Sequence, residues 1–400
     1  MCLWGRRWQY LIQREKTLFD FKPPLQTSAS PLLLVLDRRN DPVTPLLLQW
    51  TYHAMVHELV GISNGLVDLS HAPGTNPETK QIVLSAHQDA FFNQSQYFNF
   101  GELGESIRDY VNSYQSKSQS QQKIESIADM KQFVESYPEF RKLSGNVTKH
   151  VTLVGELSRL VSDNHLLTVS ELEQSLACNE QHKSDLEQLK ALIANPAITP
   201  VYKVRCVILY ALRYEKFTQT ILELKQLLAR NGVDGSMISY NIARLSKQVV
   251  DSILRFGGRN MRQGDLFENN NFFTRGINAI KGLKGVENVY TQHKPLLSQI
   301  LDMFVQGRDP NKMSQLYPVV SKVPQYPSEH GPGPSDVGVT GRSYREIIVF
   351  IVGGVTLEEE AAVAKLNANP PIPGLNVIIG GTNLHNSASF LDEISTAFFA

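Results

Sequence analysis

Two aspartates stand four residues apart, Asp37 and Asp41, in the stretch LDRRNDPVTP. In an aspartyl-phosphate enzyme of the D-x-D-x-T type, one aspartate attacks a phosphoryl group and another, two residues on, donates a proton. A spacing of four puts the carboxyl groups in the wrong relation for those two roles. Asp41 instead suits an Asx-turn over Pro42, and Pro45 suits the first turn of a following helix. The pattern predicts a rigid strand-to-helix corner with no catalytic group.

His53 and His57 are four residues apart, so a helix places both imidazoles on one face, and Glu58 follows. Zinc proteases use this spacing in the order H-E-x-x-H, with a glutamate directly after the first histidine. Here no glutamate follows His53, and no third ligand is evident nearby. Helix packing or hydrogen bonding therefore explains the pair better than a metal site. We expect no metal, no cofactor and no catalytic residue in this chain.

Two glycine pairs, 353–354 and 380–381, each close a short apolar run. Neither belongs to a G-x-G-x-x-G or a G-x-x-x-x-G-K-[ST] pattern, so tight turns are a better interpretation than phosphate binding. The stretch GGRNMR at 257–262 has two interpretations. It could form an anion-binding nest, but a helix C-cap explains its glycines equally well.

Composition and charge narrow the function classes. The 39 basic and 39 acidic residues cancel, which gives no global electrostatic reason to expect nucleic acid or an anionic membrane as a partner. Cys2, Cys178 and Cys206 are far apart and form no C-x-x-C pair, which favours a reducing, cytosolic setting. No run approaches the ~18 apolar residues of a membrane span. We therefore expect no direct membrane insertion.

Short apolar runs are the elements expected to position these residues. Residues 31–36, 347–352 and 377–379 are each continuously apolar, which is typical of a buried parallel strand. Between the last two runs, Thr356 suits the N-cap of a helix, because the acidic residues after it favour the positive helix end. We predict a parallel α/β sheet whose first strand is separated from the others by an insertion of about 280 residues.

The insertion is predicted to be a second, mostly helical domain. We assign residues 1–45 and 344–400 to the α/β domain and 46–323 to the helical domain. Residues 324–343 are rich in proline, glycine and serine and are assigned to a flexible linker. Apolar spacings predict helices over these ranges: 9–20, 46–59, 168–194, 201–230 and 236–256. The polar, low-complexity stretch 113–123 predicts a flexible connection.

Two further amphipathic helices are predicted between residues 122 and 164, on either side of Pro138, which must break or bend the path. After Pro138 the apolar residues recur at spacings of three and four: Phe140, Leu143, Val147, Val151, Val154, Leu157 and Val161. Two interpretations of this stripe remain open. It is either ordinary core, or a partly exposed surface that takes a partner's helix in a groove.

Three stretches resemble the SM (Sec-one/Munc-eighteen) family, whose members chaperone SNARE assembly. LDRRNDPVTPLLLQWTYHAMVHELVGI is similar to that family's hallmark strand-to-helix segment, IESIADMKQFVESYPEFRKLSGNVTKHVTLVGELSRLV to its helical hairpin, and EIIVFIVGGVTLEE to its returning strand. QWTYHAMVHEL, GELSRLVSD and GLKGVENVYTQHKPLL are most similar to the vacuolar protein sorting 45 subgroup, which serves endosomal and trans-Golgi traffic. The structural signature residues of the resemblance are Asp37, Asp41, Pro42, Thr44, Pro45, Gly353 and Gly354.

The resemblance implies an arch-shaped protein in which a hairpin at about 106–161 aligns syntaxin-type and vesicle-type SNARE helices before they zip. Pro138 matches the proline at the hairpin's tip, and Leu143 and Val151 match apolar positions that meet the vesicle SNARE. The SNARE-binding residues expected on this basis are Pro138, Phe140, Leu143, Val147, Val151 and Val154. Tethering or Rab-effector proteins are further expected partners. The implied location is cytoplasmic, peripheral to Golgi, trans-Golgi network and endosome membranes.

The chain departs from the family pattern at its N-terminus. Family members begin with an α/β domain ahead of the segment that opens this sequence, and we expect that domain to be absent here. Two alternatives to SNARE templating therefore stay open. One is a scaffold that binds only a regulatory or tethering partner through its α/β domain, and the other is an α/β hydrolase or phosphotransferase.

Overall fold

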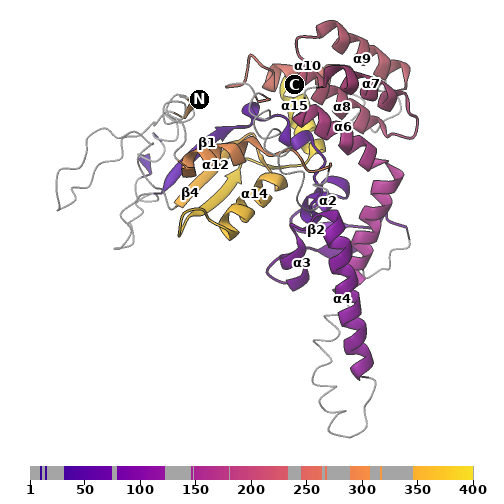
Figure 1. Ribbon diagram of the computed structural model, residues 1–400, viewed down its shortest axis with the longest axis vertical. Coiled ribbons are helices and arrows are strands. Elements are labelled where there is room, and N and C mark those ends of the chain that lie inside the picture. The colour runs from indigo at the N-terminus through magenta and orange to yellow at the C-terminus, as the bar shows by residue number, and fades with distance from the viewer. Residues whose placement is uncertain are drawn as a thin grey trace, which may run out of the picture.

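The computed structural model describes these residues: 10, 14–15, 31–73, 79–121, 146, 148–179, 181–232, 245–263, 266–267, 289–306, 316–317 and 346–399. The predicted linker 324–343 lies outside these ranges, as does most of the helix predicted over 9–20. Figure 1 shows a small sheet on one side, a group of helices above it, and one long helix projecting away.

Three parallel strands form the sheet: β1 (Leu32–Asp37), β4 (Glu346–Val352) and β6 (Asn376–Gly381). Their order is β1-β4-β6, so the strand that returns after the long insertion lies in the centre. Leu34 pairs with Val349, which pairs on its other side with Ile379. The predicted parallel α/β sheet with a large helical insertion is therefore confirmed.

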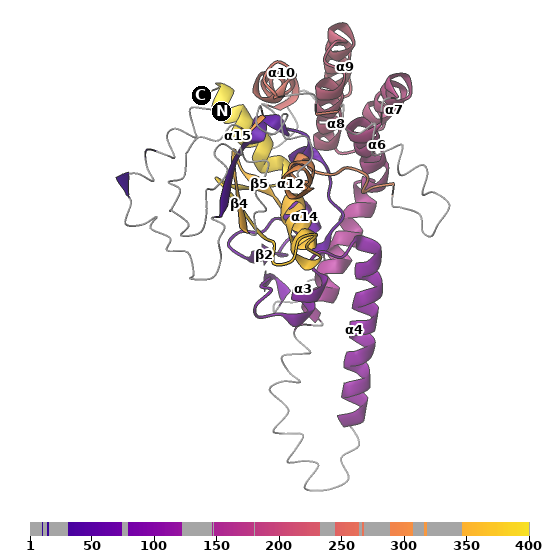
Figure 2. The same ribbon diagram turned by 60° about the vertical axis from the view of Figure 1, so that its left-hand side comes forward.

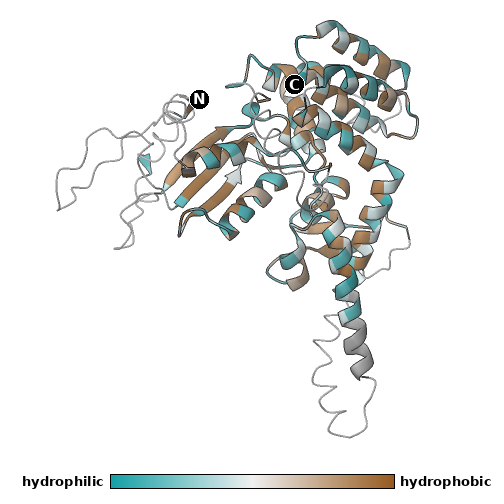
Figure 3. Cartoon of the chain, in the orientation of Figure 1, coloured by the Kyte–Doolittle hydropathy of each residue, from teal (hydrophilic) through white to brown (hydrophobic). Residues whose placement is uncertain are grey.

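One face of the sheet is covered by two helices, α12 (Leu296–Gln306) and α14 (Leu357–Ala368). The shared core includes Leu34, Val349 and Val377 from the strands, Ile300 from α12 and Val363 from α14. Figure 3 shows that the strands are largely apolar along their length, as burial requires. α12 lies within the range that we assigned to the helical domain, yet it packs on the sheet. The domain boundaries themselves stay a prediction.

The opposite face of the sheet is more open. Leu33, Ile348 and Ile378 are aligned in one row across the three strands, and all three are exposed. Alternate residues of a strand point to opposite faces, so these side chains cannot join the core beneath α12 and α14.

The helical unit is built around α8 (Pro200–Arg213), which contacts its neighbours on several sides. Those neighbours are α6 (Leu166–Cys178), α7 (His182–Ala194), α9 (Thr218–Arg230) and α10 (Leu245–Gly257). The C-terminal helix α15 (Ser387–Phe399) leaves the sheet unit and packs on α10. Helix α15 therefore connects the sheet to the group of helices around α8, as Figure 2 shows.

Two predicted helices each prove to be two. The range 168–194 is divided between α6 and α7, and 201–230 between α8 and α9. At the second break, Tyr214 donates a hydrogen bond from its hydroxyl to Asp185 Oδ2 at 2.5 Å, and Phe217 N donates to Tyr214 O at 2.9 Å. These contacts reverse the chain without interrupting the apolar spacing, so periodicity does not reveal the turn.

The helix predicted over 46–59 begins later than expected. A single 3-10 turn, η2 (Thr44–Leu46), is followed by an extended stretch, and α2 spans Tyr52–Leu59. Leu48 N donates to Glu173 Oε2 at 2.9 Å, and Trp50 Nε1 donates to Ser170 Oγ at 2.8 Å. Both acceptors belong to α6, and their hydrogen bonds hold the chain extended.

Smaller elements lie around α2. β2 (Leu66–Asp68) and β3 (Gln81–Val83) pair antiparallel, and α3 (Ala90–Ser95) follows. α4 (Phe100–Gln121) is the long projecting helix, and another helix spans 148–163. The prediction of a flexible connection at 113–123 is therefore wrong for 113–121, because serine, glutamine and lysine lack apolar periodicity but still tolerate a helix that begins upstream. None of the helices with described placement combines the length and apolar character needed to span a bilayer.

Arg38 lies at the centre of the strand-to-helix corner, in the 3-10 turn η1 (Arg38–Asn40), and is 1% exposed. Its Nε and Nη2 donate to Gly354 O at 3.1 and 2.9 Å, and Nη1 donates to Asp41 O at 3.2 Å. Nη2 also donates to Glu359 Oε2 at 2.5 Å. Glu359 forms a capping box with Thr356 at the start of α14, which confirms the helix start expected at Thr356. The guanidinium thus joins β1, the turn after β4, and α14.

The glycine pair after β4 is explained by close approach as well as by turning. Gly353 and Gly354 have φ values of +92° and +91°, a region that favours glycine. A Cβ on Gly353 would lie 2.8 Å from Arg38 Cβ, and a Cβ on Gly354 would overlap the ring of His385, which lies in the short strand β7 (Leu384–His385) paired with β5 (Val355–Thr356). No phosphate-binding loop is needed to account for them.

Asp41 performs a capping role. It accepts hydrogen bonds from Thr44 N at 3.0 Å, Thr44 Oγ1 at 2.6 Å and Leu296 N at 3.0 Å, which ties the corner to the start of α12. Burial alone would raise the pKa of Asp41, but Arg38, His293 and the hydrogen bonds from Thr44 together outweigh it and hold that pKa below the usual range. Pro45 lies in the turn η2 rather than in the first turn of α2.

We predict that Arg38→Met lowers the free energy of unfolding by about 3–5 kcal/mol, because it leaves the Glu359 carboxylate buried without its partner. The neighbouring Arg39 pairs with Asp37 but is 40% exposed, so Arg39→Met should cost about 1 kcal/mol or less. Urea denaturation of the two variants measures the difference. Equal losses would contradict the central role of Arg38.

Candidate functional site

The predicted hairpin is anchored by two helices that run side by side, α4 and the 148–163 helix (Figures 1 and 2). Leu103 from α4, with Leu153 and Leu157 from the second helix, is fully buried. They share a core cluster with Trp50 and Tyr52. The base of the hairpin therefore belongs to the body of the protein.

Two of the six predicted SNARE-binding residues fall within the described ranges. Val151 is 45% exposed, whereas Val154 is half-buried and packs against the core cluster. The other four lie outside the described residues: Pro138, Phe140, Leu143 and Val147. In the described part of the stripe, Val154 therefore contributes to the core and Val151 is exposed, and the binding of a partner's helix by the exposed part stays a prediction.

The buried face of the 148–163 helix is formed by residues at spacings of three and four: His150, Leu153, Leu157 and Val161. Val151 lies outside that face. Its neighbours on the outward face are exposed and mostly small: Thr148, Gly155, Ser158 and Ser162. Small side chains allow another helix to approach closely, and Val151 adds an apolar contact among them.

A polar cluster that the sequence analysis missed lies beneath this helix. Asp89, 3% exposed, accepts a hydrogen bond from His150 Nε2 at 2.9 Å and pairs with Lys149. His150 Nδ1 lies 2.8 Å from the hydroxyl of Tyr52. His150 continues the apolar spacing of Leu153, Leu157 and Val161, and that periodicity was the available signal for its burial.

The electrostatics of this cluster follow from burial and pairing. Burial by itself would raise the pKa of Asp89, but hydrogen bonds from His150 and Lys149 outweigh it and hold that pKa well below its usual range. Burial lowers the pKa of His150, and Asp89 only partly opposes it. A neutral imidazole fits the contacts, with Nε2–H donating to Asp89 and Nδ1 accepting from Tyr52.

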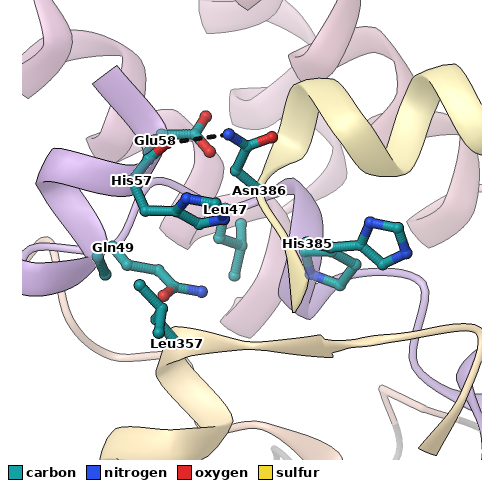
Figure 4. Close-up of a pocket in the computed structure, with 9 residues that line it drawn as sticks. Leu47, Gln49, His57, Glu58, Leu357, His385 and Asn386 are labelled. Atoms are coloured by element: carbon teal, nitrogen blue, oxygen red, sulfur yellow. Dashed lines mark hydrogen bonds between the residues drawn. The ribbon is translucent and has the colours of Figure 1, made fainter. Parts of the chain in front are cut away.

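The histidine pair on α2 occupies a junction between the two units. His57 lines a cavity of about 10 Å³ together with Gln49, Leu357 and Asn386, as Figure 4 shows. Its ring nitrogens have no hydrogen-bond partner among the placed residues. His53 lies edge-on to Phe92, with ring centroids 5.3 Å apart. Over the described part of the chain, no cluster of three or more metal-ligating side chains occurs.

The other residue of that motif, Glu58, is committed to an internal network. Its Oε1 accepts from Arg205 Nη1 at 2.6 Å and from Ser387 Oγ at 2.5 Å. Arg205 also donates to Glu173 Oε1 at 2.5 Å. The network joins α2, α6, α8 and α15.

The GGRNMR stretch ends a helix. Gly258 N donates to Leu254 O at 2.9 Å, as expected just after α10. Arg259 N, which an anion-binding nest would direct at its ligand, donates to the Glu215 carboxylate at 2.8 Å. An internal carboxylate therefore takes the position that an external anion would occupy.

Comparison with known proteins gives a consistent result. The model of the Sec1 family matches residues 5–393. Vacuolar protein sorting-associated protein 45 from Mus musculus is 44% identical over 385 residues, which is 96% of this chain and 62% of that protein. The corresponding protein from Schizosaccharomyces pombe is 42% identical and is matched over 64% of its length by 96% of this chain. This chain thus spans less than two thirds of the length of these relatives.

Solved structures agree with the sequence relatives. The structure described as SM protein Vps45 in complex with the Qa SNARE Tlg2 superposes with a TM-score of 0.80 at 44% identity, over 98% of this chain and 64% of that one. A structure of the SM protein Vps45 gives a TM-score of 0.75 at 42% identity, over 99% and 61%. The Unc18–syntaxin 1 complex from Monosiga brevicollis, at 17% identity and a TM-score of 0.68 over 97% and 64%, supports the fold alone.

We predict that the protein loses stability as the pH falls below about 6.5, through its buried histidines. Burial lowers the pKa of His53 from 6.5 to about 4 and also lowers that of His57. The folded state therefore prefers the neutral rings, so their contribution is complete above 6.5 and is lost on acidification. Each such histidine contributes up to about 1.4 kcal/mol per pH unit in this window.

Urea denaturation between pH 7.5 and 5.5 measures this effect. The double variant His53→Gln/His57→Gln should show a flatter dependence of the free energy of unfolding on pH than the wild type. His87 is exposed, so His87→Gln serves as the matched control and should keep the wild-type slope. An unchanged slope in the double variant would contradict the prediction.

Proposed function

The chain belongs to the Sec1 family, and on that premise we propose that it binds SNARE helices and templates their assembly in endosomal and trans-Golgi transport. The proposed partners are a syntaxin-type SNARE and a vesicle SNARE. The relative described as Vps45 in complex with the Qa SNARE Tlg2 supports this class of partner. The proposed role is binding rather than catalysis, and the proposed location is peripheral to Golgi and endosome membranes.

The observation that carries this proposal is the exposure of Val151. The opposite face of its helix is locked into the core through Leu153 and Leu157, so the outward face is held in a defined direction. An apolar side chain flanked by Gly155 and Ser158 on a rigid helix suits an amphipathic partner helix.

A second candidate is the scaffold role, in which a tethering partner binds the α/β unit. The exposed row of Leu33, Ile348 and Ile378 on the open sheet face favours it, because contiguous exposed apolar side chains often mark an interaction surface. This row lies on the sheet, away from the hairpin helices (Figure 1). The two candidates are therefore separable by mutation.

We predict that Val151→Asp weakens the binding of labelled SNARE-motif peptides by about tenfold or more. Burial of a valine side chain at an interface contributes about 1.5 kcal/mol or more, and an unpaired carboxylate there adds a desolvation cost. Fluorescence anisotropy with a syntaxin-type peptide and a vesicle-type peptide measures the dissociation constants.

Ile378→Asp is the matched control, because Ile378 is also an exposed β-branched residue, 55% exposed, on the other unit. It should leave the affinity for SNARE peptides unchanged. If Val151→Asp binds like the wild type, the hairpin is not the SNARE site. Loss of a tethering partner in Ile378→Asp, with no SNARE peptide bound by the wild type, would favour the scaffold candidate.

A further inference from the structure

We propose that Asp89 and His150 are positioning residues that set the orientation of the hairpin helices and so determine which face is presented to a SNARE. The inference rests on the proposed function and deepens it. Neither residue lies on the outward face of the 148–163 helix. Both are buried, and they act on the surface through the helix that carries Val151.

The first step is the carboxylate of Asp89, which serves two elements. It is the N-cap of α3, where Oδ1 accepts from Phe92 N at 3.1 Å. Its other oxygen accepts from His150 Nε2 at 2.9 Å and pairs with Lys149. One buried side chain therefore connects the start of α3 to the 148–163 helix.

The second step is the imidazole of His150, which is fully buried and contacts residues of α2, α3 and α4. Nδ1 accepts from the hydroxyl of Tyr52 on α2 at 2.8 Å. The ring lies 4.6 Å from Phe91 of α3 and 6.4 Å from Tyr110 of α4, measured between centroids. Phe91 and Tyr110 are themselves stacked, with centroids 4.5 Å apart. Both hairpin helices thus meet at one imidazole.

The third step links the buried contacts of His150 to the proposed binding surface around Val151. Consecutive residues of an α-helix point about 100° apart, so the direction of His150 determines the direction of Val151. The hydrophobic residues Leu153 and Leu157 resist removal of the helix from the core, but apolar contacts are not directional. The hydrogen bonds from His150 to Asp89 and Tyr52 are directional, and they fix the rotation of the helix about its axis.

The proposal makes a geometric prediction that needs no ligand. His150→Phe keeps a ring of similar size but removes both hydrogen bonds. Cys2 is first replaced by serine so that it does not take up a label. Spin labels are then attached to two cysteines introduced at exposed positions, Ser158→Cys on the 148–163 helix and Lys190→Cys on α7. Cys178 and Cys206 are buried. Electron–electron double resonance should show a shifted or broadened distance distribution in His150→Phe.

SNARE-peptide binding is then tested on unlabelled protein that carries neither Ser158→Cys nor Lys190→Cys, because Ser158 lies on the proposed binding face. His150→Phe should weaken binding by about fivefold or more, although its side chain does not reach the outward face. The matched control is His57→Phe, which replaces another buried histidine that has no hydrogen-bond partner on its ring among the described residues. It should change neither the label distance nor the affinity. If His150→Phe does not fold, the double variant Tyr52→Phe/Asp89→Ser replaces it, because it removes both hydrogen-bond partners of His150 while serine still offers an N-cap oxygen to α3.

The outcomes separate the two proposals. An unchanged distance distribution in a folded His150→Phe or Tyr52→Phe/Asp89→Ser variant overturns the positioning role, whether or not peptides bind. An altered distribution with wild-type affinity also overturns it, because orientation would then not matter for binding. If the wild type binds no SNARE peptide, the proposed function fails, while the label distances still report whether Asp89 and His150 orient the helix.

Discussion

The buried guanidinium of Arg38 is the constraint on which the rest of this structure depends. A charge removed from water must be paired and hydrogen-bonded, and here the acceptors are Gly354 O, Asp41 O and the Glu359 carboxylate. These acceptors come from the corner after β1, the turn after β4 and the first turn of α14. Segments at opposite ends of the chain therefore reach the same point. The close contact of Gly353 with Arg38 makes a side chain at that position unacceptable.

A second buried guanidinium, that of Arg205, connects several helices of the helical unit in the same way. It is held by Glu173 from α6 and by Glu58 from α2, and Ser387 at the start of α15 completes the group. α2 is thereby fixed at its C-terminal end between the sheet unit and the helices. At its N-terminal end Tyr52 contacts His150 at the base of the hairpin. Helix α2 therefore links the base of the hairpin to the sheet and to the helices around α8.

The hairpin helix shows how core and surface are divided on one element. His150, Leu153 and Leu157 face the body, while Val151 and Gly155 face outward. Family membership accounts for the class of partner proposed, and the geometry accounts for which side of the helix could meet it. The buried polar cluster is as much a part of this division as the apolar core, because its hydrogen bonds add directional contacts to the packing of the leucines.

The sequence by itself determined the features that depend on local order: the three buried strands, the capped start of α14, the helical insertion and the family. Apolar runs and capping residues act over a few positions, so neighbours in sequence suffice to reveal them. Only the tertiary structure decided the extended stretch before α2, since Leu48 and Trp50 find their partners on α6. It also decided that Val151 is exposed and His150 buried, because periodicity defines the faces of a helix but not what covers each one. The Asp89–His150–Tyr52 cluster joins residues far apart along the chain, so no pattern among neighbouring residues predicts that these side chains are in contact.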